Sequence, residues 1–489
     1  MRTSLLYFYL ITILISGCQI FQRDKDNDND KTVTIEEEII EKDLEEIKAE
    51  GKLTVIFDNS TTSYFIYKGQ PMGYEYELVS RFCKRHNLEL EIKIITSIEE
   101  SFKLLNSGKA DIIAYYLTVT KERLERVDFS DALLNSEQVL IQRKPENWID
   151  IPKSKWENAM IRNPVGLIGK EVHVRQSSSF VGRLKNLSDE IGGDIVVVEE
   201  PSTVETEGLI KKVADGEIEF TVADKDVALV NAAYYPVLDV ETPVSFPQQI
   251  AWAIRKNSPQ LKSELNMFIE EITNSSVHKI IYNKYFKVTR TLLERANSDL
   301  SSISGSNISE YDEIIKQWSD SIGWDWKLVA SMIYQESRFN TFAASWAGAK
   351  GLMQLMPRTG NRFGATNLYD PSQNIKAGTG YIEYLDNYWR KTVSDSLERQ
   401  KFILASYNSG LGHVQDAVAL AQEFGYLIYK WDDEVEECMK MKSKSKYYRN
   451  KVVKYGYCRG ESVVKYVEDI LYRYHQYHDH FEEEDFSTQ

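Results

Sequence analysis

The sequence has fewer basic than acidic residues and few cysteines, and no long apolar run follows its first eighteen residues. Its 59 Lys and Arg face 74 Asp and Glu, a formal net charge of −15. This balance argues against a nucleic-acid-binding protein, because phosphate recognition needs a basic surface. No later segment offers the roughly 20 apolar residues of a membrane-spanning helix. The rest is a globular composition, 42% hydrophobic and 27% charged, on a chain of 489 residues that suits two to four domains.

The 4 cysteines exclude a disulfide-rich scaffold, and no Cys/His spacing indicates a zinc site, so we predict no metal. Cys83 shares a helical face with apolar neighbours, which predicts a buried thiol. Cys438 and Cys458 flank a Lys-rich segment, and an exported chain would favour a disulfide between them. Two free thiols are the alternative, and the sequence assigns no role to the insertion at 430–460.

Residues 1–18 have the pattern of a secretory signal: Arg2, an apolar stretch at 5–15 and small residues before Cys18. That stretch is too short for a spanning helix. The ending Leu-Ile-Ser-Gly-Cys resembles the lipobox of bacterial lipoproteins, which implies a lipid on Cys18 as the membrane anchor. We therefore expect a lipid-anchored protein of the cell envelope, in the outer membrane and facing the periplasm. An ordinary signal peptide with an incidental cysteine is the alternative.

Two acidic segments hold most of the net charge. Residues 19–50 contain 12 acidic and 5 basic residues, and 476–489 contain 5 acidic residues and no Lys or Arg. Charged, apolar-poor segments cannot bury enough surface to fold alone. We interpret 19–50 as a tether and 476–489 as an acidic tail, with a nearly neutral body between them.

Strand-like and helix-like segments alternate through 51–288, which predicts an α/β fold with parallel strands. The alternation occurs twice, and the chain is expected to cross from one lobe to the other near 141–146 and back near 243–248. We therefore predict two lobes around a hinged cleft, lobe 1 from 51–143 and 246–288 and lobe 2 from 144–245. The predicted strands are 53–57, 90–95, 110–117, 171–175, 195–198, 220–223 and 249–255.

Three ordered segments of this domain carry a family resemblance: GYEYELVSRF, LLNSGKADIIAYYLTVTKERLERVDFS and VADGEIEFTVADKDVAL. They resemble the periplasmic solute-binding proteins for polar amino acids. By that resemblance Arg123 grips a ligand carboxylate, with the Thr118 hydroxyl nearby, and Asp224 meets the ligand amine. Ser177 and Ser178 open a helix whose N–H groups favour an anion. As alternatives, Arg123 is a surface residue of a turn and Asp224 caps the next helix.

A linker at 289–307, rich in Ser and Asn, precedes a helical domain at 308–475. The helix predicted at 325–339 carries Glu336 on its apolar face, because Glu336 follows Val329 by seven residues and Met332 by four. Burial and the helix C-terminus both disfavour the carboxylate, so we expect a raised pKa. An acid that stays protonated near neutral pH suits proton donation to a glycosidic oxygen. A surface glutamate at a helix end is the alternative.

Three motifs surround this glutamate: QESRFN at 335–340, GAKGLMQLMP at 348–357 and ASYNSG at 405–410. Together they resemble the lysozyme-like soluble lytic transglycosylases, with an all-α fold. The resemblance makes Glu336 the single acid and base. It implies further residues at the glycan: Ser337, Met353, Gln354, Tyr407, Asn408 and Tyr466. For Met353, a place in the hydrophobic core is the alternative.

The two domains on one lipoprotein resemble the membrane-bound lytic murein transglycosylase F family. That resemblance implies a lyase, an exotransglycosylase that cleaves peptidoglycan glycan strands to 1,6-anhydromuramoyl ends and needs no cofactor. It also implies that the first domain binds an amino acid or a muropeptide. The alternatives are a ligand sensor with a glycan-binding C-terminal domain, a hydrolysing lysozyme and a first domain that is only a spacer.

Overall fold

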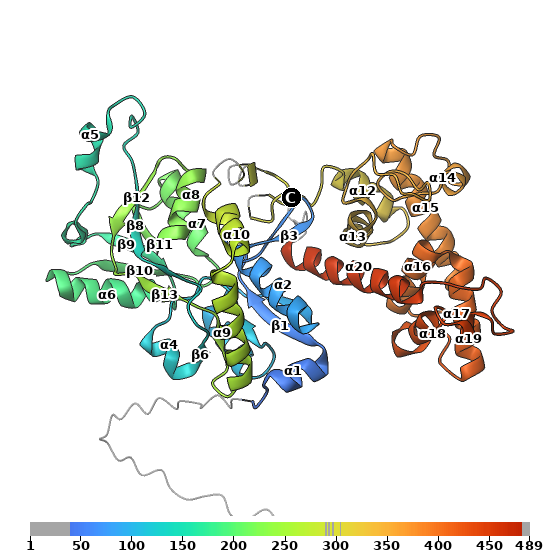
Figure 1. The fold of residues 1–489 in the computed structure, drawn as a ribbon. Helices are drawn as coiled ribbons and strands as arrows, with labels where there is room; N and C mark the ends of the chain where they lie inside the picture. The colour runs from blue at the N-terminus through green and yellow to red at the C-terminus, as the bar shows by residue number, and fades with distance from the viewer. Residues whose placement is uncertain (1–39, 289–290, 292–293, 296–297, 304, 482–489) are drawn as a thin grey trace, which may run out of the picture. The chain divides into compact units, whose positions relative to one another are not determined.

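The computed structural model describes residues 40–481 except 289–290, 292–293, 296–297 and 304. An α/β domain ends at α10, and a helical domain begins at α12 (Figure 1). Cys18 and most of the predicted tether lie outside the described residues. Among the described helices, none combines the length and the apolar character that crossing a membrane requires.

The first lobe is built on a five-stranded sheet in the order β4-β1-β5-β14-β6. β1 is parallel to β4 and β5, whereas β14 is antiparallel to β5 and β6. Residues 53–57 of β1 are buried, because the sheet packs helices on both faces. The strands are β1 Lys52–Phe57, β2 Phe65–Tyr67, β3 Gln70–Met72, β4 Glu89–Ile94, β5 Ile112–Ile113, β6 Asp128–Phe129 and β14 Ala253–Ile254. The helices are α1 Leu44–Glu50, α2 Tyr74–His86, α3 Ile98–Asn106, α4 Lys121–Arg126, α9 Pro259–Thr273 and α10 Ser276–Phe286.

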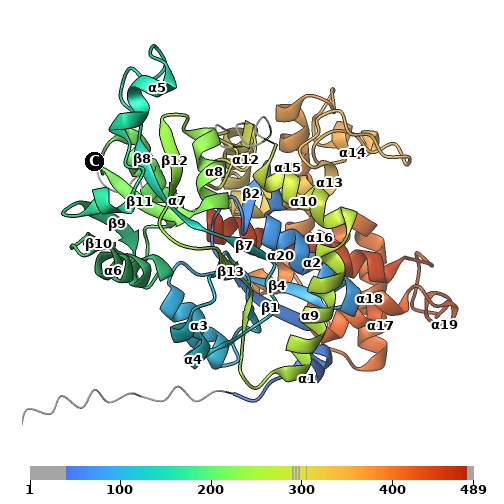
Figure 2. The same cartoon turned by 60° about the vertical axis from the view of Figure 1, so that its left-hand side comes forward.

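The second lobe has its own five-stranded sheet, in the order β10-β9-β11-β8-β12. β9 is parallel to β10 and β11, and β8 runs antiparallel to β11 and β12. Figure 2 shows α6 against the β9 and β10 side of this sheet. The strands are β8 Gln138–Arg143, β9 Glu171–Arg175, β10 Val196–Glu200, β11 Phe220–Asp224 and β12 Leu238–Pro243. The helices are α5 Lys153–Trp156, α6 Ser179–Ile191, α7 Thr206–Asp215 and α8 Lys225–Tyr234, with 3-10 turns at Glu157–Ala159 and Pro164–Leu167.

The first chain crossing lies earlier than the predicted boundary at residue 143. β8 belongs to the second sheet, so the chain leaves the first lobe at β7, Leu134–Ser136, which pairs with β13, Gln248–Ile250. Leu140 of β8 packs in one hydrophobic cluster of this lobe, and Val139 and Ile141 pack in the other. A strand buried on both faces belongs inside a sheet rather than in a connection, which is why the sequence boundary was wrong.

The predicted tether also ends too late. α1 begins at Leu44, and both Leu44 and Ile47 are buried in the core of the first lobe. Asp43 caps this helix in a reciprocal pair with Glu46, and it also accepts a hydrogen bond from the backbone N–H of Leu261 at 2.8 Å. The folded domain therefore starts near residue 43.

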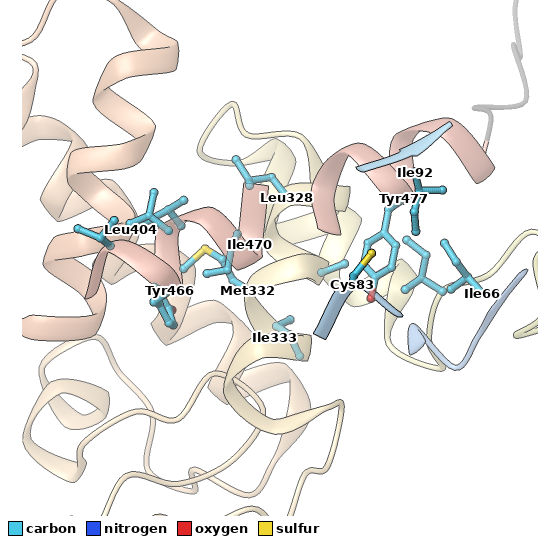
Figure 3. Packing of buried hydrophobic residues seen from close by; sticks show 14 of the residues in the cluster. Ile66, Cys83, Ile92, Leu328, Met332, Ile333, Leu404, Tyr466, Ile470 and Tyr477 are labelled. Carbon is cyan, nitrogen blue, oxygen red and sulfur yellow. The ribbon is translucent and has the colours of Figure 1, made fainter. Parts of the chain in front are cut away.

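The helical domain packs α13 against α12 and α20, and α16 against α15, α17 and α20. Figure 3 shows Met332 of α13 beside Ile470 of α20, and Leu404 of α16 in the same cluster. The helices are α12 Asp312–Asp320, α13 Trp326–Ser337, α14 Pro357–Arg362, α15 Pro371–Trp389, α16 Ser396–Ser409, α17 Leu411–Phe424, α18 Glu436–Met441, α19 Ser445–Tyr448 and α20 Gly460–His480, with a π-helical turn at Trp431–Val435.

α20 extends past the predicted start of the acidic tail at 476. Gln476 and Tyr477 are buried, and the Tyr477 hydroxyl donates to the carbonyl of Gly69 at 2.8 Å. Residues 476–480 therefore continue a packed helix rather than a solvated tail.

Cys438 and Cys458 are buried free thiols, so the expected disulfide does not form. A buried ion pair fastens this insertion instead: Lys442 Nζ lies 2.7 Å from Asp416 Oδ2. Asp416 also accepts hydrogen bonds from the backbone N–H groups of Lys454 and Tyr455, each at 2.8 Å. The lysine-rich insertion is thus attached to α17 by a buried ion pair whose carboxylate is also hydrogen-bonded to the backbone.

Candidate active site and ligand cleft

Glu336 occupies the last turn of α13, whose preceding residues 326–334 are all buried. The helix ends because Arg338 takes a left-handed conformation, with φ of 52°. Glu336 itself is half-buried, where the core face of the helix meets solvent. The helical period predicted this position, and the negative end of the helix dipole lies at the carboxyl group.

One hydroxyl group contacts this carboxyl group directly. Tyr466, from α20, donates to Glu336 Oε1 at 2.5 Å. Burial raises the pKa of Glu336 to about 7, and the Tyr466 hydrogen bond opposes part of that rise. Among the described residues no second carboxylate contributes to this pKa shift. Glu336 is therefore a solitary acid that exchanges its proton near neutral pH.

A tight turn carries the second motif next to this site. Gly351 has φ of 77°, and a Cβ there would lie 2.0 Å from the Leu368 carbonyl oxygen. Asn374 holds the turn, because its Oδ1 accepts from the Met353 N–H at 2.8 Å and its Nδ2 donates to the Lys350 carbonyl at 3.1 Å. Asn374 is fully buried, and the sequence reading missed it because it lies outside the three motifs.

Tyr407 and Met353 meet through this turn. The Tyr407 hydroxyl donates to the Met353 carbonyl at 2.9 Å, so its hydrogen bond goes to the backbone rather than to Glu336. Glu336 nevertheless lies close enough to raise the pKa of Tyr407, second to burial as a cause. Met353 is fully buried, so its side chain belongs to the core and does not line an open cleft. This corrects the sequence interpretation, since the side chain fills space beside Gly378.

The other predicted glycan-binding residues are half-buried or exposed. Gln354 donates its amide to the carbonyls of Ala343 and Gly351, and Ser337 donates to the Ile333 carbonyl one turn earlier. Asn408 is exposed near the end of α16.

The predicted ligand residues of the first domain converge between the two lobes. Arg123 is buried and donates to the Thr118 carbonyl at 2.8 Å and to the Ser177 carbonyl at 3.4 Å. Arg123 and Thr118 come from the first lobe, and Ser177 from the second, so Arg123 spans the cleft. Asp224 does not cap α8 with its side chain, which excludes the alternative interpretation of this residue. Ser178, at the start of α6, also faces the cleft.

Four further charged residues line the same cavity and were missed by the sequence reading: Asp58, Arg175, Glu205 and Glu207. Asp58 follows β1, and Arg175 is the last residue of β9. Ligands of α/β sheets bind outside the carboxyl ends of strands, and that rule could have found both residues. Burial raises the pKa of Glu205 to about 8, and those of Glu207 and Asp224 to about 7. The cleft is therefore rich in carboxyl groups.

Comparison with known proteins assigns both halves of the chain. Residues 53–288 match the bacterial extracellular solute-binding proteins, family 3, and residues 313–429 match the transglycosylase SLT domain. An ancestral arginine-binding protein bound to arginine is 23% identical with a TM-score of 0.41, and the match covers 48% of this chain and 98% of that chain.

Two curated relatives match most of the chain. Membrane-bound lytic murein transglycosylase F of Desulfosudis oleivorans is 36% identical over 431 residues, 88% of this chain and 91% of that protein. The protein of the same name from Saccharophagus degradans is 30% identical over 432 residues, 87% of this chain and 82% of that protein. This chain belongs to the membrane-bound lytic murein transglycosylase F family, peptidoglycan lytic transglycosylases with a solute-binding-protein-like domain at the N-terminus.

Proposed function

We propose that Glu336 cleaves the β-1,4 bond between N-acetylmuramic acid and N-acetylglucosamine without adding water. Glu336 donates its proton to the glycosidic oxygen as the bond from that oxygen to muramoyl C1 breaks. The N-acetyl group of the substrate stabilises the positive charge that develops at C1. The Glu336 carboxylate then takes the proton of the C6 hydroxyl, whose oxygen bonds to C1 and closes the 1,6-anhydro ring. The proton returns to Glu336, so one residue acts first as acid and then as base.

The solitary, half-buried carboxyl group is the observation that carries this proposal. Glycosidases that use water generally pair two carboxyl groups, one as acid and one as base or nucleophile. Glu336 has Tyr466 beside it in place of a second carboxylate, and its pKa of about 7 suits both roles near neutral pH. Tyr466 supports the base role in particular, because its hydroxyl stabilises the ionised form.

Mass spectrometry of peptidoglycan digested by the full chain tests the reaction. The proposal expects soluble fragments that end in 1,6-anhydromuramic acid. Reducing ends would instead identify a hydrolysing lysozyme, and an absence of fragments would identify a glycan-binding sensor. Either outcome contradicts the proposed transglycosylase reaction.

We also propose that the interlobe cleft binds a carboxylate-bearing ligand, an amino acid or a muropeptide, and that binding alters the activity. The buried guanidinium of Arg123 supports this, because it lies where a ligand carboxylate would meet it and Asp224 stands in the same cavity. A ligand shifts a conformational equilibrium only by its differential affinity for the two states. Coupling of about 1–3 kcal/mol would change activity by roughly 5-fold to 150-fold. An activity assay with and without each candidate ligand tests this, and unchanged activity at saturation would indicate a spacer.

For localisation we propose a lipid at Cys18 that anchors the chain in the cell outer membrane, facing the periplasm. The lipobox pattern supports it, and the relatives are named membrane-bound. Cys18→Ala should move the protein out of the membrane fraction, because acyl chains contribute about 0.8 kcal/mol per buried CH₂. Membrane association that survives Cys18→Ala would reject this anchor.

A further inference from the structure

The cavity between the lobes contains more negative than positive groups. Its charged lining residues are Asp58, Arg123, Arg175, Glu205, Glu207 and Asp224, four carboxyl groups against two guanidinium groups. Hydrogen bonds and strand pairing divide them between two ends. At one end Arg123 donates to the Thr118 carbonyl, and Ser179 bonds to both Thr118 and Gln138, the residue paired with Asp224. At the other end Asp58 accepts from the Ser60 hydroxyl and Glu207 from the Thr61 hydroxyl. After burial, repulsion by Asp58 is the largest cause of the raised pKa of Glu205, which places Glu205 at this end. The cavity thus has an Arg123–Asp224 end and a second end with three carboxyl groups and one Arg.

Several polar atoms in this cavity have no hydrogen-bond partner among the residues that the structure describes. Asp224 Oδ1, Arg175 Nε, Glu205 Oε1 and Ser178 Oγ are buried without a hydrogen bond. Asp224 and Arg175 are each only 5% exposed. Leaving a buried polar group without a partner is unfavourable, so a cluster of such groups around one cavity indicates a polar ligand. The unpartnered atoms occur at both ends of the cavity.

The size of the cavity favours a small ligand. Its volume is about 70 Å³ with the two lobes in contact. A cavity needs roughly 10–15 Å³ to admit one water, so this one has room for more than a single water. That space is on the scale of one free amino acid rather than of a disaccharide peptide.

The charged groups of the cavity that the α-carboxylate and α-ammonium of an amino acid do not contact indicate which side chain the cavity accepts. A zwitterionic α-amino acid would place its carboxylate at Arg123 and its ammonium at Asp224. Three carboxyl groups and Arg175 would remain at the far end, so two of the carboxyl groups lack a basic partner there. A cationic side chain would let these buried carboxyl groups ionise and pair with it, whereas a neutral one would leave them without that partner and an acidic one would add to their repulsion.

We propose that the cleft selects a free α-amino acid with a cationic side chain, held by Asp58 and Glu205. This rests on the proposed function of the cleft as an amino-acid receptor and adds the ligand's chemical class. Burial and repulsion by Asp58 raise the pKa of Glu205 to about 8, and a bound cation would relieve that repulsion. Glu207 is already engaged, since its carboxylate accepts from the Thr61 hydroxyl at 2.7 Å across the cleft.

Calorimetry on the full chain with matched amino acids tests the proposal. L-arginine is compared with L-citrulline, which has nearly the same shape without the charge, and L-lysine with L-norleucine. Each cationic member should bind roughly 10-fold to 100-fold more tightly, as expected for a charge-assisted contact with a buried carboxylate. Equal affinities within a pair, or a tighter neutral member, would overturn the cationic selectivity.

Variants locate the selectivity within the cleft. Glu205→Gln and Asp58→Asn should each narrow the ratio of arginine to citrulline affinity while leaving citrulline binding within a few-fold. Glu219→Gln is the control and should leave the ratio unchanged, because Glu219 is a surface carboxylate of the lobe that holds Glu205 and pairs with Lys170. Thermal melting checks that each variant is folded, and a ratio unchanged in both cleft variants would overturn the assignment of these residues.

The outcomes also separate the two levels of the proposal. If neutral amino acids bind as well as cationic ones, the receptor function stands and the selectivity fails. If only muropeptides bind, the receptor function stands and a free amino acid as its ligand is rejected. If neither amino acids nor muropeptides bind, the receptor function itself is rejected.

Discussion

The two sites of this chain use buried carboxyl groups in opposite ways. In the helical domain no other described carboxyl group shifts the pKa of Glu336, whose value of about 7 comes from burial, opposed by one hydrogen bond from Tyr466. In the cleft of the α/β domain, Glu205 and Asp224 combine burial with repulsion from other carboxyl groups. The same rise in pKa therefore has two meanings. A solitary carboxyl group is suited to proton transfer, whereas a crowded set is suited to binding a cation.

The two sites also differ in the structural elements that position their side chains. Glu336 is fixed by regular secondary structure, since α13 and α20 position the acid and its tyrosine. The cleft is assembled from the carboxyl ends of strands in two lobes, and Arg123 spans the gap between them. We therefore expect substitutions at the first site to change catalytic rates and those at the second to change ligand affinity.

The largest effect is expected for Glu336→Gln. Glutamine keeps the size of the side chain but cannot donate and retake a proton, so the rate should fall at least about 100-fold. Release of anhydromuropeptides measures this, with circular dichroism to check the fold. Glu383→Gln, an exposed position of the same domain, is the control. A nearly wild-type rate for Glu336→Gln would remove the proposed acid and base.

A smaller effect, on binding, is expected for Arg123→Ala. Removing one partner of a buried charge contact costs about 2–5 kcal/mol, so amino-acid affinity should fall roughly 30-fold or more. Calorimetry measures this, and Arg126→Ala on the same helix is the control, because Arg126 pairs with Glu99 on the surface. Basal glycan cleavage should be unaffected. An amino-acid affinity that is unchanged in Arg123→Ala would show that Arg123 does not bind the ligand carboxylate. It would also contradict the expectation that substitutions in the cleft change ligand affinity.

The smallest effect is expected for Tyr466→Phe. Its hydrogen bond stabilises the ionised Glu336, so its loss should raise the pKa of Glu336 by about one unit or more. The alkaline limb of the rate profile should then move to higher pH, because the protonated acid persists further. Tyr407→Phe is the matched control, since that hydroxyl bonds to the Met353 carbonyl. An unmoved limb in Tyr466→Phe, or an equal shift in both variants, would contradict the role given to Tyr466.

The position of Glu336, the proposed acid, was predictable because its environment is mostly local in sequence. The spacing of Val329, Met332 and Glu336 on one helix places the carboxyl group at the edge of the core, and the structure has it half-buried there. The sequence assigned Tyr466 to the glycan cleft but could not show that it bonds to Glu336, because helical contacts across 130 residues depend on packing.

The charged cleft was only partly predictable. Arg123 and Asp224 could be predicted because they lie in a family motif. Asp58, Arg175 and Glu205 were missed, because they lie in loops and at strand ends that meet only after both sheets form. The disulfide prediction failed for a related reason. The sequence shows the two cysteines but not the buried pair of Lys442 and Asp416 that closes the same segment.

The pH dependence of kcat/KM for glycan cleavage by the unmodified chain tests the central claim most directly, that a solitary buried Glu336 starts the reaction as a protonated acid. Because kcat/KM reports the free enzyme, it should fall on the alkaline side with an apparent pKa of about 7, the value expected for Glu336. A rate that stays constant from about pH 6 to about pH 9 would contradict the claim, since Glu336 would then be ionised through most of the active range.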